Sequence, residues 1–307
     1  MFLNSKDHPY QASLWHIMWN WQRSAVQFFL LSALIVASIY HYELIDPKVQ
    51  FPSFPLAVIG GALGIFVSFR TNSAYQRWWE GRKLWGRMIN TSRHLCTQAV
   101  AYLPAHAAQE IVHRHITYVH VLRCGLRGEG LAQDAHILRS VNQLELDLLK
   151  SSTNPNHALL NLQLKRLVEL REQKEISEFY LSDMDASLRH LLDIQGGTER
   201  IKKTPFPPAY GFLAEQLTKI YACLLPIALF HHLSWWVVPV NILVCMCFQM
   251  VNEVGRVLEN PFEDIWPALP LTAMSLTIER NLRQALNETE LPDAESVQHA
   301  GNSFVLM

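Results

Sequence analysis

The hydrophobic pattern of the chain is dominated by three uncharged apolar stretches, at 26–40, 51–69 and 220–252. A helix needs about 20 apolar residues to cross a bilayer, so the first two stretches are near the lower limit and the third is too long for one crossing. The third is interrupted by HHLS at 231–234, next to two tryptophans, which favour the membrane interface. The pattern therefore predicts four transmembrane helices, the last two forming a hairpin. The alternative interpretation is a set of buried helices in a large soluble protein.

The long region between these hairpins has a different pattern, typical of amphipathic helices. Segments 108–127 and 155–181 repeat apolar residues at steps of three and four. Ser182 followed by Asp185 resembles a capping box and predicts the start of a short helix, which the glycine pair 196–197 would end. Because no stretch of useful length alternates as a strand does, the sequence predicts an all-α membrane protein with a large cytoplasmic helical region.

This order of stretches predicts five segments along the chain. They are a cytoplasmic N-terminal segment 1–23, a first transmembrane hairpin 24–80, a cytoplasmic helical region 81–208, a second transmembrane hairpin 209–254 and a cytoplasmic C-terminal segment 255–307.

The distribution of basic residues predicts the orientation. Residues 70–93 carry five arginines and a lysine, whereas the loop 41–53 carries two acidic residues and one lysine. The positive-inside rule then places the region after Phe69 and both termini in the cytoplasm. The expected location is a membrane that the chain crosses several times.

Composition supports a membrane protein and argues against nucleic acid as a partner. Apolar residues make up 50% of the chain and charged residues 17%, below the usual quarter, and the net charge is -1. The basic, tryptophan-rich segment RTNSAYQRWWEGRKLWG at 70–86 could bind a single strand. However, Arg77 and Glu80 can pair on a helix, and arginines with tryptophans are expected at a membrane boundary. The boundary interpretation is therefore preferred.

No enzyme, cofactor or metal site is predicted. His113 and His120 would share a helix face, but His115 would not, and the spacing matches no zinc pattern. Ordinary surface or core histidines are the preferred interpretation. The chain has no phosphate loop, nucleotide fingerprint or Ser-His-Asp arrangement.

The segment after the second apolar stretch resembles the bestrophin family, its bacterial members in particular. Segments 193–210 and 259–266 resemble the family's entry into its third span and the N-P-F segment behind its fourth, so the likeness covers nearly the whole chain. It implies an all-helical homopentamer with one central pore, an ion channel. The residues of the signature segment are Arg70, Asn72, Ser73, Ala74, Tyr75, Arg77, Trp78, Trp79, Glu80 and Arg82.

The resemblance also implies a narrow hydrophobic neck on the second helix, with lining residues every four positions. Stepping back from Phe69 gives Ile65 and then Gly61, which share a helix face. Five copies of Ile65 and Phe69 would form an apolar constriction that gates by dewetting; the alternative is that both pack against neighbouring helices. Gly61 departs from the bulky apolar residue usual there. Like Gly60 and Gly64, it could instead allow close helix packing, and the sequence leaves this choice open.

A second constriction at the cytoplasmic mouth is implied by the resemblance. Counting back from the Q-G-G segment places it at Phe179, with Ile176 as the alternative. A core phenylalanine is the competing interpretation of Phe179.

Calcium activation is not expected. Calcium prefers six to eight oxygen ligands, and a calcium-controlled relative carries a run of acidic residues behind N-P-F. Here only Glu263 and Asp264 follow that motif, so they are expected to be solvated or paired with arginines.

The sequence thus predicts a passive channel for monovalent ions, with further copies of itself and the lipid bilayer as partners. The resemblance favours cations, sodium among them, over chloride. The alternatives are an anion channel of the same fold, a non-conducting membrane scaffold or accessory protein, and a membrane-bound enzyme with its site in the cytoplasmic helices.

Overall fold

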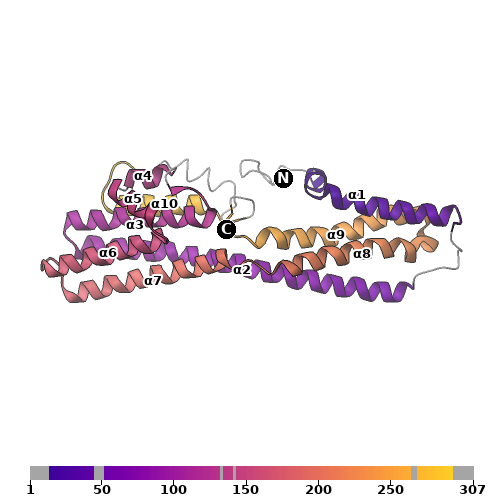
Figure 1. Cartoon of the computed structure of the whole chain (residues 1–307), viewed down its shortest axis with the longest axis horizontal. Helices are drawn as coiled ribbons and strands as arrows, with labels where there is room; N and C mark the ends of the chain where they lie inside the picture. Colours follow the sequence, from indigo (N-terminus) through magenta and orange to yellow (C-terminus); the bar gives the residue numbers. More distant parts are fainter. Residues whose placement is uncertain (1–13, 45–51, 132–133, 141–142, 264–267, 293–307) are drawn as a thin grey trace. The chain divides into compact units, whose positions relative to one another are not determined.

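The computed structural model describes residues 14–44, 52–131, 134–140, 143–263 and 268–292, and these residues form helices and connecting turns without strands (Figure 1). The all-α expectation is confirmed. The helices are α1 (Leu14–His41), α2 (Ser53–Tyr102), α3 (Ala105–Arg127), α4 (Ala135–Ser140), α5 (Gln143–Ser151), α6 (Pro155–Glu172), α7 (Glu178–Lys203), α8 (Pro208–Leu233), α9 (Val237–Leu258) and α10 (Leu271–Ala285).

These helices form two compact units. The first contains α1, α8, α9 and α2 up to Trp78; the second contains α2 from Trp79 together with α3 to α7 and α10. Helix α2 is a single helix of 50 residues and belongs to both units. The predicted boundaries at residues 80 and 208 are not tested by this division and remain predictions.

The first unit has the composition of a membrane region. Among the described residues, three stretches are long and apolar enough to cross a membrane: 22–41, 208–258 and 54–102, the last of which continues into the second unit. The stretch 208–258 consists of α8 and α9, which lie side by side and are joined by a 3₁₀ turn at Ser234–Trp236 (Figure 1). The break expected near 231–234 therefore exists, and it starts at Ser234, whose φ is +49°.

The core of the first unit is apolar and is crossed by a few polar side chains. Phe29 of α1, Leu63 of α2 and Leu225 of α8 are members of its buried cluster. Within it, Asn241 donates a hydrogen bond of 2.9 Å to the carbonyl of Phe29. Such interhelical bonds from Asn tie membrane helices together where apolar packing alone does not favour association over lipid.

The second unit is built around α3. This helix packs against α6, α7 and α10, and its middle is buried on most sides. Some of the polar groups inside are paired: His115 lies 2.8 Å from the hydroxyl of Ser92, and the hydroxyl of Tyr118 donates to the carbonyl of Leu191 at 3.1 Å. Burial lowers the pKa of His115 to about 3, so this imidazole is neutral in the folded protein.

The predicted capping box was assigned to the wrong residues. Helix α7 starts at Glu178, where Ser177 accepts a hydrogen bond from the backbone N–H of Tyr180, and it continues past both glycines to Lys203. Gly197 is tolerated inside the helix because α2 passes close to it: an added Cβ would lie 2.8 Å from a methyl carbon of Leu84. The glycine therefore serves helix packing and does not terminate the helix.

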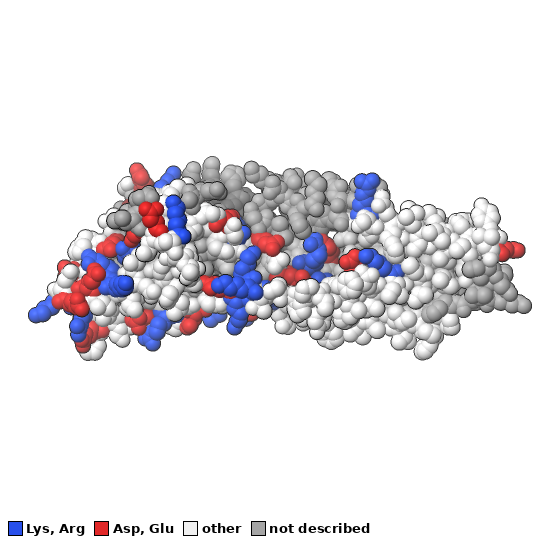
Figure 2. Space-filling view, in the orientation of Figure 1, with Lys and Arg blue, Asp and Glu red and all other residues white. Residues whose placement is uncertain are grey.

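The two units differ in the number of charged residues on their surfaces. In Figure 2 the surface over the right-hand part of α1, α8 and α9 is nearly uncharged, whereas Lys, Arg, Asp and Glu are spread over α3, α6 and α7. An uncharged surface of this kind suits hydrocarbon, and the mixed-charge surface suits water.

Replacing Gly60 by alanine is expected to lower the melting temperature of the purified protein. A Cβ there would lie 2.8 Å from the hydroxyl oxygen of Tyr221 and 3.1 Å from its ring, and overpacking of this kind costs roughly 1–3 kcal/mol. Gly61→Ala is the matched control, because no atom lies within 4 Å of that position. It should melt at or slightly above the wild-type temperature, and equal melting temperatures for both variants would contradict the packing of α2 on α8.

Candidate functional site

One face of α2 in the first unit is open to the surroundings. Ile65 and Phe69 are 61% and 69% exposed, so neither packs into the helix bundle of its own chain. No atom would lie within 4 Å of a Cβ at Gly61. These residues line a groove of about 580 Å³, and the full lining is Gly61, Gly64, Ile65, Ser68, Phe69 and Asn72. The three residues proposed for the neck therefore share one open, mostly apolar surface.

The opposite face of α2 is buried, and the glycines of α2 differ in whether they lie on this face or on the open one. Leu63 and Val67 belong to the buried core, and Gly60 lies against Tyr221 of α8. A Cβ at Gly64 would be 3.5 Å from the ring of Phe248 of α9, an ordinary contact. Close packing thus accounts for Gly60, whereas Gly61 contacts no other helix of the chain.

Arg70 holds α2 against the end of α9. Its side chain is 3% exposed, and one terminal nitrogen donates to the carbonyl of Asn252 at 3.1 Å and also to the side-chain oxygen of Asn252. The other terminal nitrogen forms an ion pair with Glu259. Arg77 adds a bond of 2.8 Å to the backbone carbonyl of Glu259. We call these four residues the Arg70 clamp; charged bonds of this kind are among the strongest in proteins.

Two small residues let the helices approach at the clamp. An added Cβ at Gly211 of α8 would lie 3.1 Å from a guanidinium nitrogen of Arg70, and one at Gly255 of α9 would lie 3.1 Å from the hydroxyl of Thr71. Thr71 itself donates to the carbonyl of Val251 at 3.1 Å. Larger residues at either glycine would push the helices apart.

Other signature residues lie on the surface of α2. Asn72 and Ser73 are exposed, Tyr75 and Trp79 are about half exposed, and the rings of Tyr75 and Trp78 are 6.1 Å apart. The suggested pair of Arg77 with Glu80 is replaced by two other contacts. Glu80 forms an ion pair with Arg200 of α7 in the second unit, whereas Arg77 bonds to the backbone at Glu259 in the first.

The two candidates for the cytoplasmic constriction have different environments. Phe179, in the first turn of α7, is 86% exposed, whereas Ile176 is buried. Only Phe179 presents its side chain to the outside of the second unit, so the interpretation as a core phenylalanine does not hold.

The residues behind the N-P-F motif are partly described. Phe262 is buried in the second unit, and its ring would lie 3.2 Å from a Cβ at Gly81. Glu263 is partly exposed, and Asp264 lies outside the described residues. The absence of calcium activation stays a prediction.

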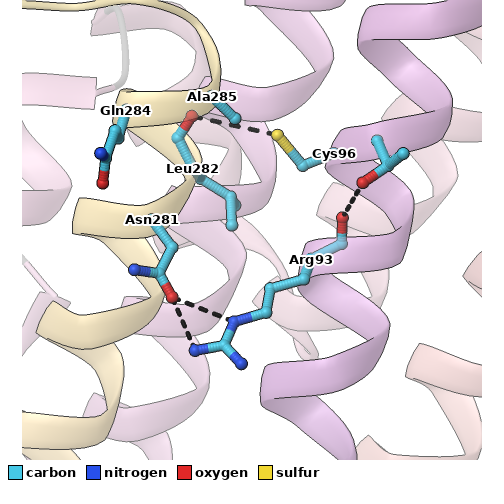
Figure 3. A pocket seen from close by; sticks show the side chains of 7 residues that line it. Arg93, Cys96, Asn281, Leu282, Gln284 and Ala285 are labelled. Carbon is cyan, nitrogen blue, oxygen red and sulfur yellow. Dashed lines mark hydrogen bonds between the residues drawn. The ribbon is translucent and has the colours of Figure 1, made fainter.

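The residues that line the pocket between α2 and α10 do not form a nucleophile–base pair of the kind used in catalysis (Figure 3). Arg93 donates to the side-chain oxygen of Asn281 at 3.0 and 2.7 Å, and Cys96 points its sulfur at the carbonyl of Leu282, 3.9 Å away. No histidine or carboxylate is among the lining residues that could activate this thiol.

The three histidines of α3 that were considered as a metal site have separate partners. His113 lies 2.6 Å from a carboxylate oxygen of Glu288, His115 contacts Ser92, and His120 lies 2.9 Å from Glu279. They do not converge on one another, in line with their spacing.

Comparison with known proteins identifies the family. The sequence model of the family described as "Bacterial/Fungal Bestrophin protein" matches residues 17–284. The chain therefore belongs to the bacterial and fungal bestrophins.

Relatives and solved structures agree with this assignment. The "Voltage-dependent anion channel-forming protein YneE" of Escherichia coli is 29% identical over 266 residues, 86% of each chain. Protein alr2987 of Nostoc, which carries the same description, is 31% identical over 247 residues, covering 78% of this chain and 80% of the relative. The crystal structure of a bacterial bestrophin homologue from Klebsiella pneumoniae has a TM-score of 0.81 at 28% identity, covering 86% of this chain and 98% of that one.

The sequence analysis missed the partners of Arg70. The arginine is part of the recognised signature, but Asn252 and Glu259 lie 182 and 189 positions away. The local signal for this contact is Glu259, directly before N-P-F, because a carboxylate close to an apolar stretch is expected to pair with a basic side chain.

Replacing Arg70 by methionine is expected to lower the unfolding free energy by about 3 kcal/mol, because Glu259 and Asn252 lose their cation while remaining largely buried. Adding Glu259→Gln should recover part of the loss, since it removes the unpaired charge. The control is Lys219→Met, which breaks the exposed pair with Glu215 on α8 and should cost no more than about 1 kcal/mol. Denaturant titration in detergent measures all three, and equal losses for Arg70→Met and Lys219→Met would refute the clamp.

Proposed function

We propose that this chain forms an ion channel in which the open face of α2 lines the pore. The observation that carries the proposal is the composition of that face. Ile65 and Phe69 alternate along it with Gly61, Ser68 and Asn72, and all five are open to the surroundings. A purely lipid-facing surface does not favour a polar residue such as Ser68, because polar groups at membrane depth usually face protein or a water-filled path.

The pore requires several copies of the chain. A single chain supplies one open α2 face, which is a surface and not a tube. Cyclic symmetry closes such faces around an axis, and the family resemblance makes five the proposed number. Rings of Ile65 and Phe69 would then form an apolar neck that controls conduction by dewetting.

The proposed topology has four membrane crossings. Helices α1, α8, α9 and the first half of α2 supply them, and the arginine-rich part of α2 from Arg70 onward lies in the cytoplasm with both termini. The location is the bacterial inner membrane. Phe179 is the proposed cytoplasmic constriction, because it is exposed and Ile176 is not.

The ions are monovalent and move passively down their gradient. The neck residues carry no charge, so the neck itself favours neither sign. The resemblance favours sodium, whereas the relatives in Escherichia coli and Nostoc are described as anion channel-forming proteins. This contrast makes the sign of the permeant ion the first property to measure.

Changing both Ile65 and Phe69 to alanine is expected to raise the single-channel conductance in planar bilayers, because a wider and less apolar neck is easier to wet. The control is Ile35→Ala on α1, which removes an equally exposed isoleucine outside the groove and should leave the conductance unchanged.

The same recordings determine the ion. Under a NaCl gradient, the sign of the reversal potential separates cation from anion selectivity. A monomer in detergent, or pentamers of the double variant that carry no current, would count against the channel and favour a non-conducting scaffold.

A further inference from the structure

Three residues from distant parts of the second unit meet in one cluster. His120 of α3, His136 of α4 and Glu279 of α10 offer ligand atoms that all lie within 4.8 Å of one another. Both His120 Nε2 and His136 Nδ1 are 2.9 Å from the same oxygen, Oε2 of Glu279. The two imidazole rings are stacked, with centroids 4.7 Å apart and planes 9° apart.

The donor set is that of a zinc-type site. Two imidazole nitrogens and one carboxylate oxygen, with a fourth position left for water, are a recurrent arrangement for zinc.

The contacts within the cluster are not fully satisfied by hydrogen bonds alone. His136 Nδ1 is 2.9 Å from the Glu279 oxygen, yet its geometry does not make a hydrogen bond. This nitrogen is buried beside the carboxylate without a hydrogen-bond partner among the described residues, and a cation near both atoms would attract the nitrogen lone pair and the negative oxygen. His120 Nδ1 is also buried without a hydrogen-bond partner among the described residues.

Neighbouring residues fix the ligands in place. Arg283 donates to the other oxygen of Glu279 at 2.9 Å, which leaves Oε2 turned to the imidazoles. The carboxylate of Asp134 accepts from the backbone N–H groups of His136 and Ile137 at 2.9 and 3.1 Å and so holds the start of α4. Such outer contacts orient metal ligands in known sites.

The cluster is also accessible. The side chains of His120 and Glu279 are 0% and 3% exposed, but that of His136 is 26% exposed. An ion can therefore reach the cluster past His136 and then be held by two buried groups.

We propose that His120, His136 and Glu279 bind a divalent transition-metal ion of the zinc class, with water as the fourth ligand. In a tetrahedral zinc site, bonds of about 2.0–2.1 Å separate the ligand atoms by roughly 3.3 Å, so the two contacts of 2.9 Å need to widen by only a few tenths of an ångström. The ion ties α10 to α3 and α4. The proposal does not depend on channel activity. The spacing of His113, His115 and His120 predicts no metal site. The proposed site could not be found from that spacing, because one of its ligands, Glu279, is 159 positions away from His120 in the sequence.

The test uses the full-length protein in detergent, stripped with a chelator and titrated separately with Zn²⁺ and Co²⁺. The wild type is expected to bind one ion per chain, and bound cobalt should show the strong visible absorption of a tetrahedral site. His136→Ala should weaken binding roughly 100-fold or more, since even loss of an outer contact costs 10–100-fold. This variant is chosen because His136 is partly exposed on a short helix.

His113→Ala is the matched control. It removes a comparable histidine–glutamate contact from the same helix, His113 to Glu288, without touching the three ligands, and should bind zinc as the wild type does. Zinc should also raise the melting temperature of the wild type and of His113→Ala, but not of His136→Ala. The proposal is overturned if the stripped wild type takes up no metal, or if His136→Ala binds it as tightly as the wild type. In either case the cluster is a hydrogen-bonded core network only.

Discussion

The Arg70 clamp is the interaction on which the arrangement of the first unit depends. A guanidinium has five donors in a fixed plane and stays charged, so it needs acceptors in definite directions. Here they come from Asn252 and Glu259, at the end of α9. A cation 3% exposed beside an apolar bundle is costly unless all partners are present, so the clamp forms only when the helices have one relative rotation and height.

The rotation of α2 about its own axis, which the clamp fixes, determines which of its side chains face outward. With Arg70 and Ala74 turned inward, the residues one step round the helix, Phe69 and Ser73, turn outward. Gly60 packs on Tyr221 and Gly61 does not for the same reason, since adjacent residues of a helix point in directions about 100° apart. The open face of α2 therefore follows from the clamp and from the buried residues on the opposite side of the helix, and the sequence of the open face alone does not create it.

Much of the fold can be predicted from local patterns, because apolar stretches, helical periodicity and the break at 231–234 are local signals. The predicted start of α7 is wrong because two sites fit a helix start in the sequence. Ser182 and Asp185 match a capping box, but Ser177 is the residue that caps the helix, and packing decides between the two sites. The roles of the glycines depend on what lies opposite them, such as Leu84 for Gly197. The partners of Arg70 and the cluster of His120, His136 and Glu279 join residues far apart in the chain, and a single sequence carries no signal for such pairings.

The continuity of α2 has a mechanical consequence. Its 50 residues contain a proline only at Pro55, in the first turn, so every later residue of the helix has a backbone N–H to donate. Helices bend sharply at prolines, bulges or inserted groups, and α2 beyond its first turn has no proline to provide such a hinge. Bending α2 between Leu56 and Tyr102 would therefore have to distort the backbone hydrogen bonds of the helix itself.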